Sequence, residues 1–98
     1  MKLLQNAQVG TFESSDIMIL VEPAPEGTGR DIELNSIVKL QYGETILQSI
    51  HEILDQFDIQ DVKMVANDKG ALPPTIQARV ETAIKRSLNI QEGTLQQF

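Results

Sequence analysis

The chain of 98 residues contains no cysteine and a single histidine. Without cysteine it cannot form a disulfide framework, a thiolate metal site or a cysteine nucleophile, and it suits a reducing compartment. One imidazole and scattered carboxylates without ligand spacing do not supply a metal-binding cluster. We therefore predict that the protein holds no metal.

Long apolar runs and phosphate-binding motifs are also missing. No stretch approaches the roughly twenty apolar residues of a membrane helix, and the first residues lack the apolar core of a signal peptide. Gly27-Thr28-Gly29 has neither a GxGxxG nor a GKS/T context, which argues against a phosphate-cradling loop. We expect a soluble, cytoplasmic protein whose residues 1–98 form one domain, with flexible ends at 1–9 and 90–98.

Negative charge is concentrated in the middle of the chain. The formal net charge is −6, and residues 31–60 hold six acidic side chains against one basic side chain. Such a surface repels the phosphates of nucleic acid and favours basic protein surfaces, so we expect protein partners and neither nucleic acid nor a membrane. The alternative is a solvated helix face that only keeps the protein soluble.

The pattern of apolar residues predicts three strands. Residues 16–22 are apolar and β-branched and stop at a proline, and residues 30–35 alternate between polar and apolar side chains. We expect these two strands to pair antiparallel across the loop between them. A third alternating segment begins at residue 62 and stops at the turn sequence Asn67-Asp68-Lys69-Gly70, where we expect a positive φ at Gly70.

Two amphipathic helices are predicted from apolar residues that recur every three to four positions. The first runs from about residue 36 to 57 with Ser36 as candidate N-cap, and Gly43 either permits close packing or marks a later start. The second begins at Pro73-Pro74, and Arg79 lies in the half where positive charge complements the helix dipole. The predicted fold is α+β, with a sheet of three or slightly more strands, both helices on one face, and the order β-β-α-β-α.

One segment, Gly10-Thr11-Phe12-Glu13-Ser14-Ser15-Asp16, places two adjacent hydroxyls between two carboxylates ahead of a strand. Its turn chemistry alone favours an ordinary turn before a strand. A catalytic serine also needs an oriented base, and His51 lies in the middle of a predicted helix without a supporting motif. Glu13 and Asp16 are expected to be solvated. We therefore predict no catalytic residue and a substrate that is carried here rather than transformed.

Two later segments follow this one in order, Val38-Lys39-Leu40-Gln41-Tyr42-Gly43-Glu44-Thr45-Ile46 and Asn67-Asp68-Lys69-Gly70-Ala71-Leu72. Together the three segments resemble the acyl carrier (gamma) subunit of citrate lyase, and the resemblance covers residues 9 to 86. The resemblance implies that Ser14 carries 2'-(5''-phosphoribosyl)-3'-dephospho-CoA covalently, with Glu13 and Asp16 recognised by the prosthetic-group transferase. It implies the alpha and beta subunits of citrate lyase as partners, which exchange acetyl for citryl on the arm and cleave citryl thioester to oxaloacetate. Ser15 stands where the family also has glycine.

Two alternatives remain open at this point. A phosphopantetheine-type carrier of the fatty-acid class presents Asp-Ser-Leu at the head of a helix in an all-helical bundle, and that tripeptide is absent. A protein-interaction adaptor needs no modified serine. Between the two hydroxyls we expect Ser14 to be the modified one, because Ser15 lies closer to the ordered strand and to its backbone groups.

Overall fold

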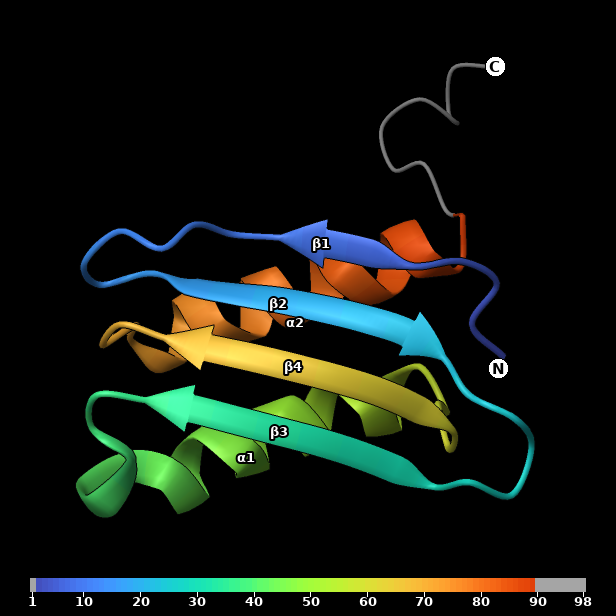
Figure 1. Ribbon diagram of the computed structural model, residues 1–98, viewed down its shortest axis with the longest axis horizontal. Coiled ribbons are helices and arrows are strands. Elements are labelled where there is room, and N and C mark those ends of the chain that lie inside the picture. The colour runs from blue at the N-terminus through green and yellow to red at the C-terminus, as the bar shows by residue number, and fades with distance from the viewer. Residues whose placement is uncertain (1, 90–98) are drawn as a thin grey trace.

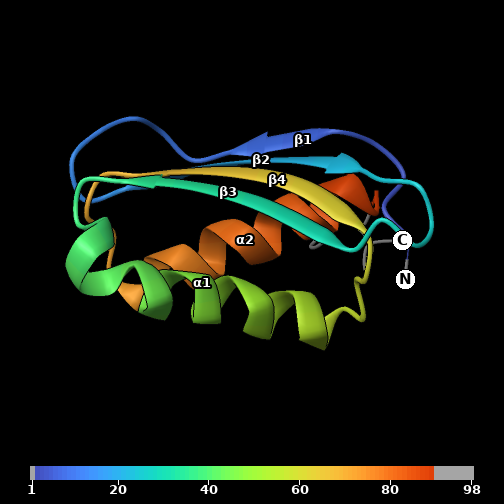
Figure 2. The same cartoon turned by 60° about the horizontal axis from the view of Figure 1, so that its bottom comes forward.

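A four-stranded sheet covered on one face by two helices makes up the computed structural model, which describes residues 2–89 (Figures 1 and 2). In chain order the elements are β1 (Ala7–Val9), β2 (Ile17–Pro23), β3 (Arg30–Ser36), α1 (Lys39–Gln56), β4 (Val62–Asp68) and α2 (Pro73–Ser87). The predicted α+β class and the placement of both helices on one face are confirmed. In the part of the chain that is described, neither helix is long and apolar enough to cross a membrane.

The sheet order is β1-β2-β4-β3, so the predicted pairing of β2 with β3 is wrong. β4 lies between them, antiparallel to β2 and parallel to β3. The parallel pair is joined through α1, since parallel neighbours need a crossover rather than a tight turn. β3 suits the edge position because Asp31 and Glu33 are exposed, and charged side chains protect an edge strand from further pairing.

β1 was not predicted, because three residues are too few to show a strand period. It pairs antiparallel with β2, from Ala7 opposite Val21 to Val9 opposite Ile19. Leu3, upstream of it, is buried in the core. The segment 2–9, expected to be a flexible end, thus contains a strand and a core residue, and residues 90–98 lie outside the described part.

The start of α1 also differs from the prediction. The N-cap position is Val38, not Ser36. The Ser36 hydroxyl instead accepts a hydrogen bond from the Val38 N–H (3.1 Å) and donates one to Asp68 Oδ2 (2.8 Å), so that it closes the turn between β3 and α1. Gly43 lies within the helix and is buried, so it does not mark a later start of the helix. The period of three to four residues places Tyr42 on the core-facing side of this helix, but Tyr42 is 57% exposed.

The core lies between the sheet and both helices. α2 begins with its two prolines in the first turn, as predicted, and buries Ile76, Val80 and Ile84. These side chains pack with fully buried residues from the other elements, among them Ile17, Ile19, Met64, Ile50 and Leu54. Each such side chain contributes about 1.5–3 kcal/mol when removed from water. Glu81 and Lys85, one turn apart on α2, form an ion pair at 2.8 Å.

Candidate functional site

The two candidate serines occupy a four-residue turn, Glu13–Asp16, which we call the serine turn. It is closed by a hydrogen bond from the Asp16 N–H to the Glu13 carbonyl oxygen (3.2 Å). Ser14 and Ser15 are both exposed. Ser15 has φ +65°, a left-handed conformation that glycine adopts without steric cost. This geometry suits the glycine that the resemblance implies at the position of Ser15.

The serine turn is joined to the turn between β4 and α2. The Ser15 N–H donates to the Lys69 carbonyl oxygen (2.8 Å), and the Lys69 N–H donates to the Asp16 carbonyl oxygen (2.9 Å). These two bonds extend the ladder between β2 and β4 by one step beyond the pairing of Ile17 with Asp68. Ser14 is thereby held at the tip of a short, paired loop.

Gly10 closes the base of the loop that carries the serine turn. Its φ is +98°, and a Cβ added there would lie 1.9 Å from the Ile17 carbonyl oxygen. No side chain can share that space with a backbone oxygen. The motif thus begins with glycine because the two ends of the loop approach one another too closely for any other residue.

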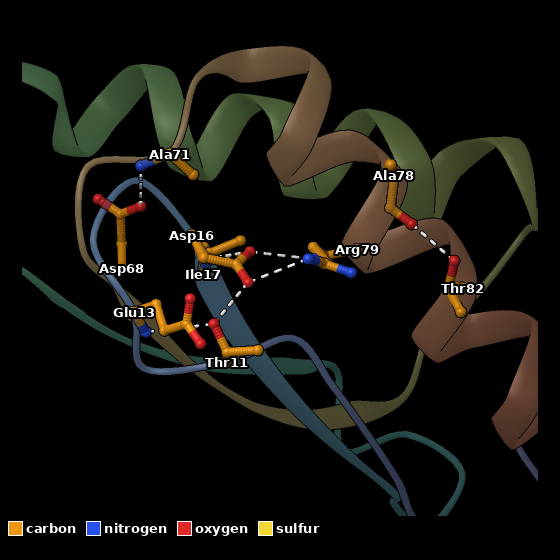
Figure 3. A network of polar contacts seen from close by, with 9 residues as sticks. All are labelled: Thr11, Glu13, Asp16, Ile17, Asp68, Ala71, Ala78, Arg79 and Thr82. Carbon is orange, nitrogen blue, oxygen red and sulfur yellow. Dashed lines mark hydrogen bonds and ion pairs between the residues drawn. The ribbon is translucent and has the colours of Figure 1, made fainter.

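Asp16 is buried, which makes the expectation that it is solvated wrong; it is 9% exposed. Oδ1 accepts from Arg79 Nε (2.9 Å) and from the Ile17 N–H (2.8 Å). Oδ2 accepts from an Arg79 terminal nitrogen (3.0 Å) and from the Thr11 hydroxyl (2.7 Å), as Figure 3 shows in part. Arg79 therefore anchors the serine turn, a role that differs from its predicted effect on the helix dipole.

These contacts also set the ionisation of Asp16. The Arg79 hydrogen bonds lower the pKa of Asp16 to about 2, helped by Thr11 and the Ile17 N–H and opposed by burial. Glu13 is the exposed carboxylate of the predicted pair, and its N–H donates to the Thr11 hydroxyl (3.1 Å). Thr11 consequently links the two halves of the loop through one oxygen.

A second buried carboxylate, Asp68, organises the neighbouring turns. It is 1% exposed and accepts hydrogen bonds from the Ser36 hydroxyl (2.8 Å), the Gly70 N–H (3.1 Å) and the Ala71 N–H (2.9 Å). Gly70 has φ +92°, which confirms the predicted positive value. Sequence reasoning recognised this turn but gave Asp68 no role, although aspartate before such a turn commonly bonds the following N–H groups.

All of these turns meet at one end of the sheet, on the left of Figures 1 and 2. An apolar groove of about 430 Å³ lies there between the start of α1 and the start of α2. Its lining residues are Val38, Tyr42, Thr45, Ile46, Gly70, Ala71, Leu72, Pro73 and Ile76. Several large apolar side chains on the segments at this end are exposed, namely Phe12, Ile37, Leu40 and Leu72.

His51 is not placed to serve Ser14 as a base. Its Nδ1 lies 3.0 Å from Arg30, whose guanidinium can only donate, and Arg30 also pairs with Asp55 (2.9 Å). Arg30 opens β3 at the end opposite Ser36, a separation of roughly 20 Å for a strand of this length. Among residues 2–89 we also find no group of three or more His, Cys, Asp or Glu side chains that could hold a metal ion.

Known proteins resemble this chain in sequence and in fold. The family model described as ACP, Malonate decarboxylase delta subunit (MdcD), matches residues 4–87. A citrate lyase acyl carrier protein of Serratia proteamaculans (strain 568) is 40% identical over 87 residues, which cover 89% of this chain and 84% of the relative. Its counterpart from Latilactobacillus sakei subsp. sakei (strain 23K) is 46% identical over 92 residues, with 94% and 89% covered.

A solved structure shares the fold. It is a chain of the crystal structure of a Pseudomonas malonate decarboxylase hetero-tetramer in complex with malonate. The TM-score is 0.73 with 20% sequence identity, and the match covers 88% of this chain and 87% of that chain. At this identity the likeness establishes the architecture alone.

The fold and the family match place the chain in the class of acyl carrier proteins. A four-stranded sheet is incompatible with the all-helical bundle of the fatty-acid class, which removes that alternative as a fold. The chain belongs to the family of citrate lyase acyl carrier proteins, which confirms the predicted resemblance.

Proposed function

We propose that this acyl carrier is a non-catalytic subunit of a citrate lyase and that its prosthetic group is attached through a phosphodiester to Ser14 Oγ. The proposed group is 2'-(5''-phosphoribosyl)-3'-dephospho-CoA. The observation that carries the proposal is an exposed serine at the tip of an anchored turn, far from the one imidazole of the chain. Such a hydroxyl can accept a group from another enzyme but has no base to activate it for chemistry of its own.

The serine turn fits a bulky substituent. The backbone bonds that hold it come from Ser15 and Asp16, so a phosphodiester on the Ser14 side chain disturbs none of them. When bound, the arm supplies the thiol whose acetyl or citryl thioester the partner subunits act on. The chain contributes a fixed attachment point, and tethering makes encounters with several active sites intramolecular at high effective concentration.

Glu13 and Asp16 contribute to recognition by the transferase in different ways. Glu13 is exposed beside Ser14 and available for direct contact. The Asp16 oxygens are occupied by Arg79, Thr11 and Ile17, so Asp16 contributes through the shape of the turn. Both residues thus belong to the proposed recognition site, one by contact and one by positioning.

The proposed partners are the alpha and beta subunits of citrate lyase and the prosthetic-group transferase. Exposed apolar side chains on the segments around the serine turn offer contact area for them, while Glu44 and Glu52 give α1 an exposed acidic side. A carrier that must bind several enzymes in turn benefits from exposed apolar side chains close to its attachment point.

Intact mass after incubation with the cognate transferase and its nucleotide donor tests the proposal. We expect one adduct of the phosphoribosyl-dephospho-CoA mass on wild type and on Ser15→Gly, and none on Ser14→Ala. Circular dichroism of each variant controls for folding. The smaller mass of phosphopantetheine, or full modification of Ser14→Ala, contradicts the proposal. Protein from a host without these enzymes serves as the unmodified reference.

A further inference from the structure

The apolar groove begins one residue away from the segment that holds the serine turn. Ser15 is hydrogen-bonded to Lys69, and the next three residues, Gly70, Ala71 and Leu72, line the groove. Adding standard backbone lengths along this path, the Cα atoms of Ser14 and Gly70 are no more than about 15 Å apart. A group attached to Ser14 by a short linker can therefore reach the groove.

The groove has the size and lining of a small-molecule site rather than of a packing defect. Its volume of about 430 Å³ falls within the usual range for ligand pockets, which are mostly apolar with a few polar groups. Tyr42, which is 57% exposed, provides an aromatic ring, and the exposed residue Thr45 provides a hydroxyl. A flat aromatic ring with hydrogen-bonding nitrogens satisfies both side chains.

The same groove is unsuited to a phosphate. Helix N-termini attract phosphates through free N–H groups, but α2 begins with Pro73 and Pro74, which have none. The next two N–H groups, of Thr75 and Ile76, both donate to the Leu72 carbonyl oxygen (2.9 and 3.1 Å). No lysine or arginine is among the lining residues. The chemistry of the groove thus favours an uncharged group over a phosphate.

We propose that the groove binds the purine ring of the nucleotide arm, with the ring stacked on Tyr42 and hydrogen-bonded by Thr45. This inference rests on the proposed function, because the arm reaches the groove from Ser14. In the proposed group, a ribose and a phosphate separate the serine oxygen from the adenosine, which matches the short distance between the turn and the groove. Seating the purine would shorten the freely moving part of the arm.

Tyrosine fluorescence gives a direct readout, because Tyr42 is the only tyrosine and the chain has no tryptophan. We expect emission of the modified protein to be at least twofold weaker than that of the unmodified protein. Ala71→Phe, which fills the groove, should restore emission even with the arm attached. Leu40→Ala is the matched control, since Leu40 is fully exposed on the same helix and does not line the groove.

Mass and fluorescence together separate the two claims. An adduct on Ser14 with unchanged Tyr42 emission overturns the purine site and leaves the carrier proposal standing. Absence of an adduct counts against the carrier proposal, and the groove is then tested on unmodified protein.

For that second test, unmodified protein is titrated with millimolar 3'-dephospho-CoA and followed by amide NMR. Shifts should concentrate at Tyr42, Thr45, Ala71 and Leu72, and adenosine should reproduce them while pantetheine does not. Shifts caused by pantetheine alone, or none at these residues, overturn the proposal. If the amide signals of the groove residues change only when the alpha subunit is added, the groove binds a protein and the purine proposal is overturned.

Discussion

The Asp16 carboxylate and the Arg79 guanidinium are joined by two hydrogen bonds, Nε to Oδ1 at 2.9 Å and a terminal nitrogen to Oδ2 at 3.0 Å, across 63 residues of sequence. Paired bonds of this kind fix orientation as well as distance. Because Asp16 is the last residue of the serine turn, the pair ties the position of Ser14 to the middle of α2. The site is thus held by the sheet on one side and by a helix on the other.

Removing the arginine should destabilise the fold. Arg79→Met leaves a buried carboxylate with fewer donors, and we expect a loss of about 1–3 kcal/mol, moderated because the Arg79 side chain is 39% exposed. Urea unfolding of Arg79→Met, Asp16→Asn and the double variant measures the coupling. The double variant should lose less than the sum of the single variants. Additive losses would show that the pair contributes nothing of its own.

The same pair should make stability depend on acid. The pKa of Asp16 is lowered from 3.8 to about 2 in the folded protein, so its contribution is complete above pH 3.8 and is lost as the pH falls through 2. The difference corresponds to at most about 2 kcal/mol. Urea midpoints between pH 5 and pH 2 should fall more steeply for wild type than for Asp16→Asn. Parallel curves for the two proteins would contradict this assignment.

Glycine in place of Ser15 should stabilise the protein. Ser15 has φ +65°, where a residue with a Cβ is strained, and relief of that strain offsets the larger entropy of glycine in the unfolded chain. We expect a gain of up to about 1 kcal/mol, or a rise of a few degrees in melting temperature. Ser14→Gly is the matched control, because Ser14 is not among the positive-φ residues and should lose stability. Equal effects at both positions would refute the conformational argument.

The acidic side of α1 should steer association with partner subunits. Glu44 and Glu52 are exposed, so Glu44→Lys with Glu52→Lys should slow binding to the alpha subunit several-fold at low salt and less at high salt. Asp55 is a poor choice for this test because it pairs with Arg30. Surface plasmon resonance at two ionic strengths measures the association rate. If neither the charge reversal nor the salt concentration changes the association rate, the acidic side of α1 serves only to keep the protein soluble.

The sequence predicted the elements with a sustained period far better than their arrangement. β3, β4 and both helices each have enough residues to show a period of two or of about three and a half, and β2 was recognised as an apolar, β-branched run. Strand order was not predicted correctly, because local sequence patterns do not show whether β2 pairs directly with β3 or whether β4 lies between the two strands. β1 was missed because its three residues carry no period.

For the site, the chemistry of the exposed turn was predictable and its anchoring was not. Ser14 and Glu13 are exposed as a turn sequence suggests, and Gly70 has the positive φ that its turn requires. Asp16 was assigned to solvent because no basic side chain lies near it in the sequence. Arg79, its partner, lies on α2 and reaches it only once the chain is folded.

The measurement that tests the central claim most directly locates the prosthetic group in protein from cells that make an active citrate lyase. Cleavage after Glu13 and Glu22 releases residues 14–22, in which Ser14 and Ser15 are the two serines. Fragmentation that preserves the adduct then separates one serine from the other. We predict the full mass of the phosphoribosyl-dephospho-CoA group on Ser14 and an unmodified Ser15. The same mass on Ser15, or unmodified serines in an active complex, would contradict the account.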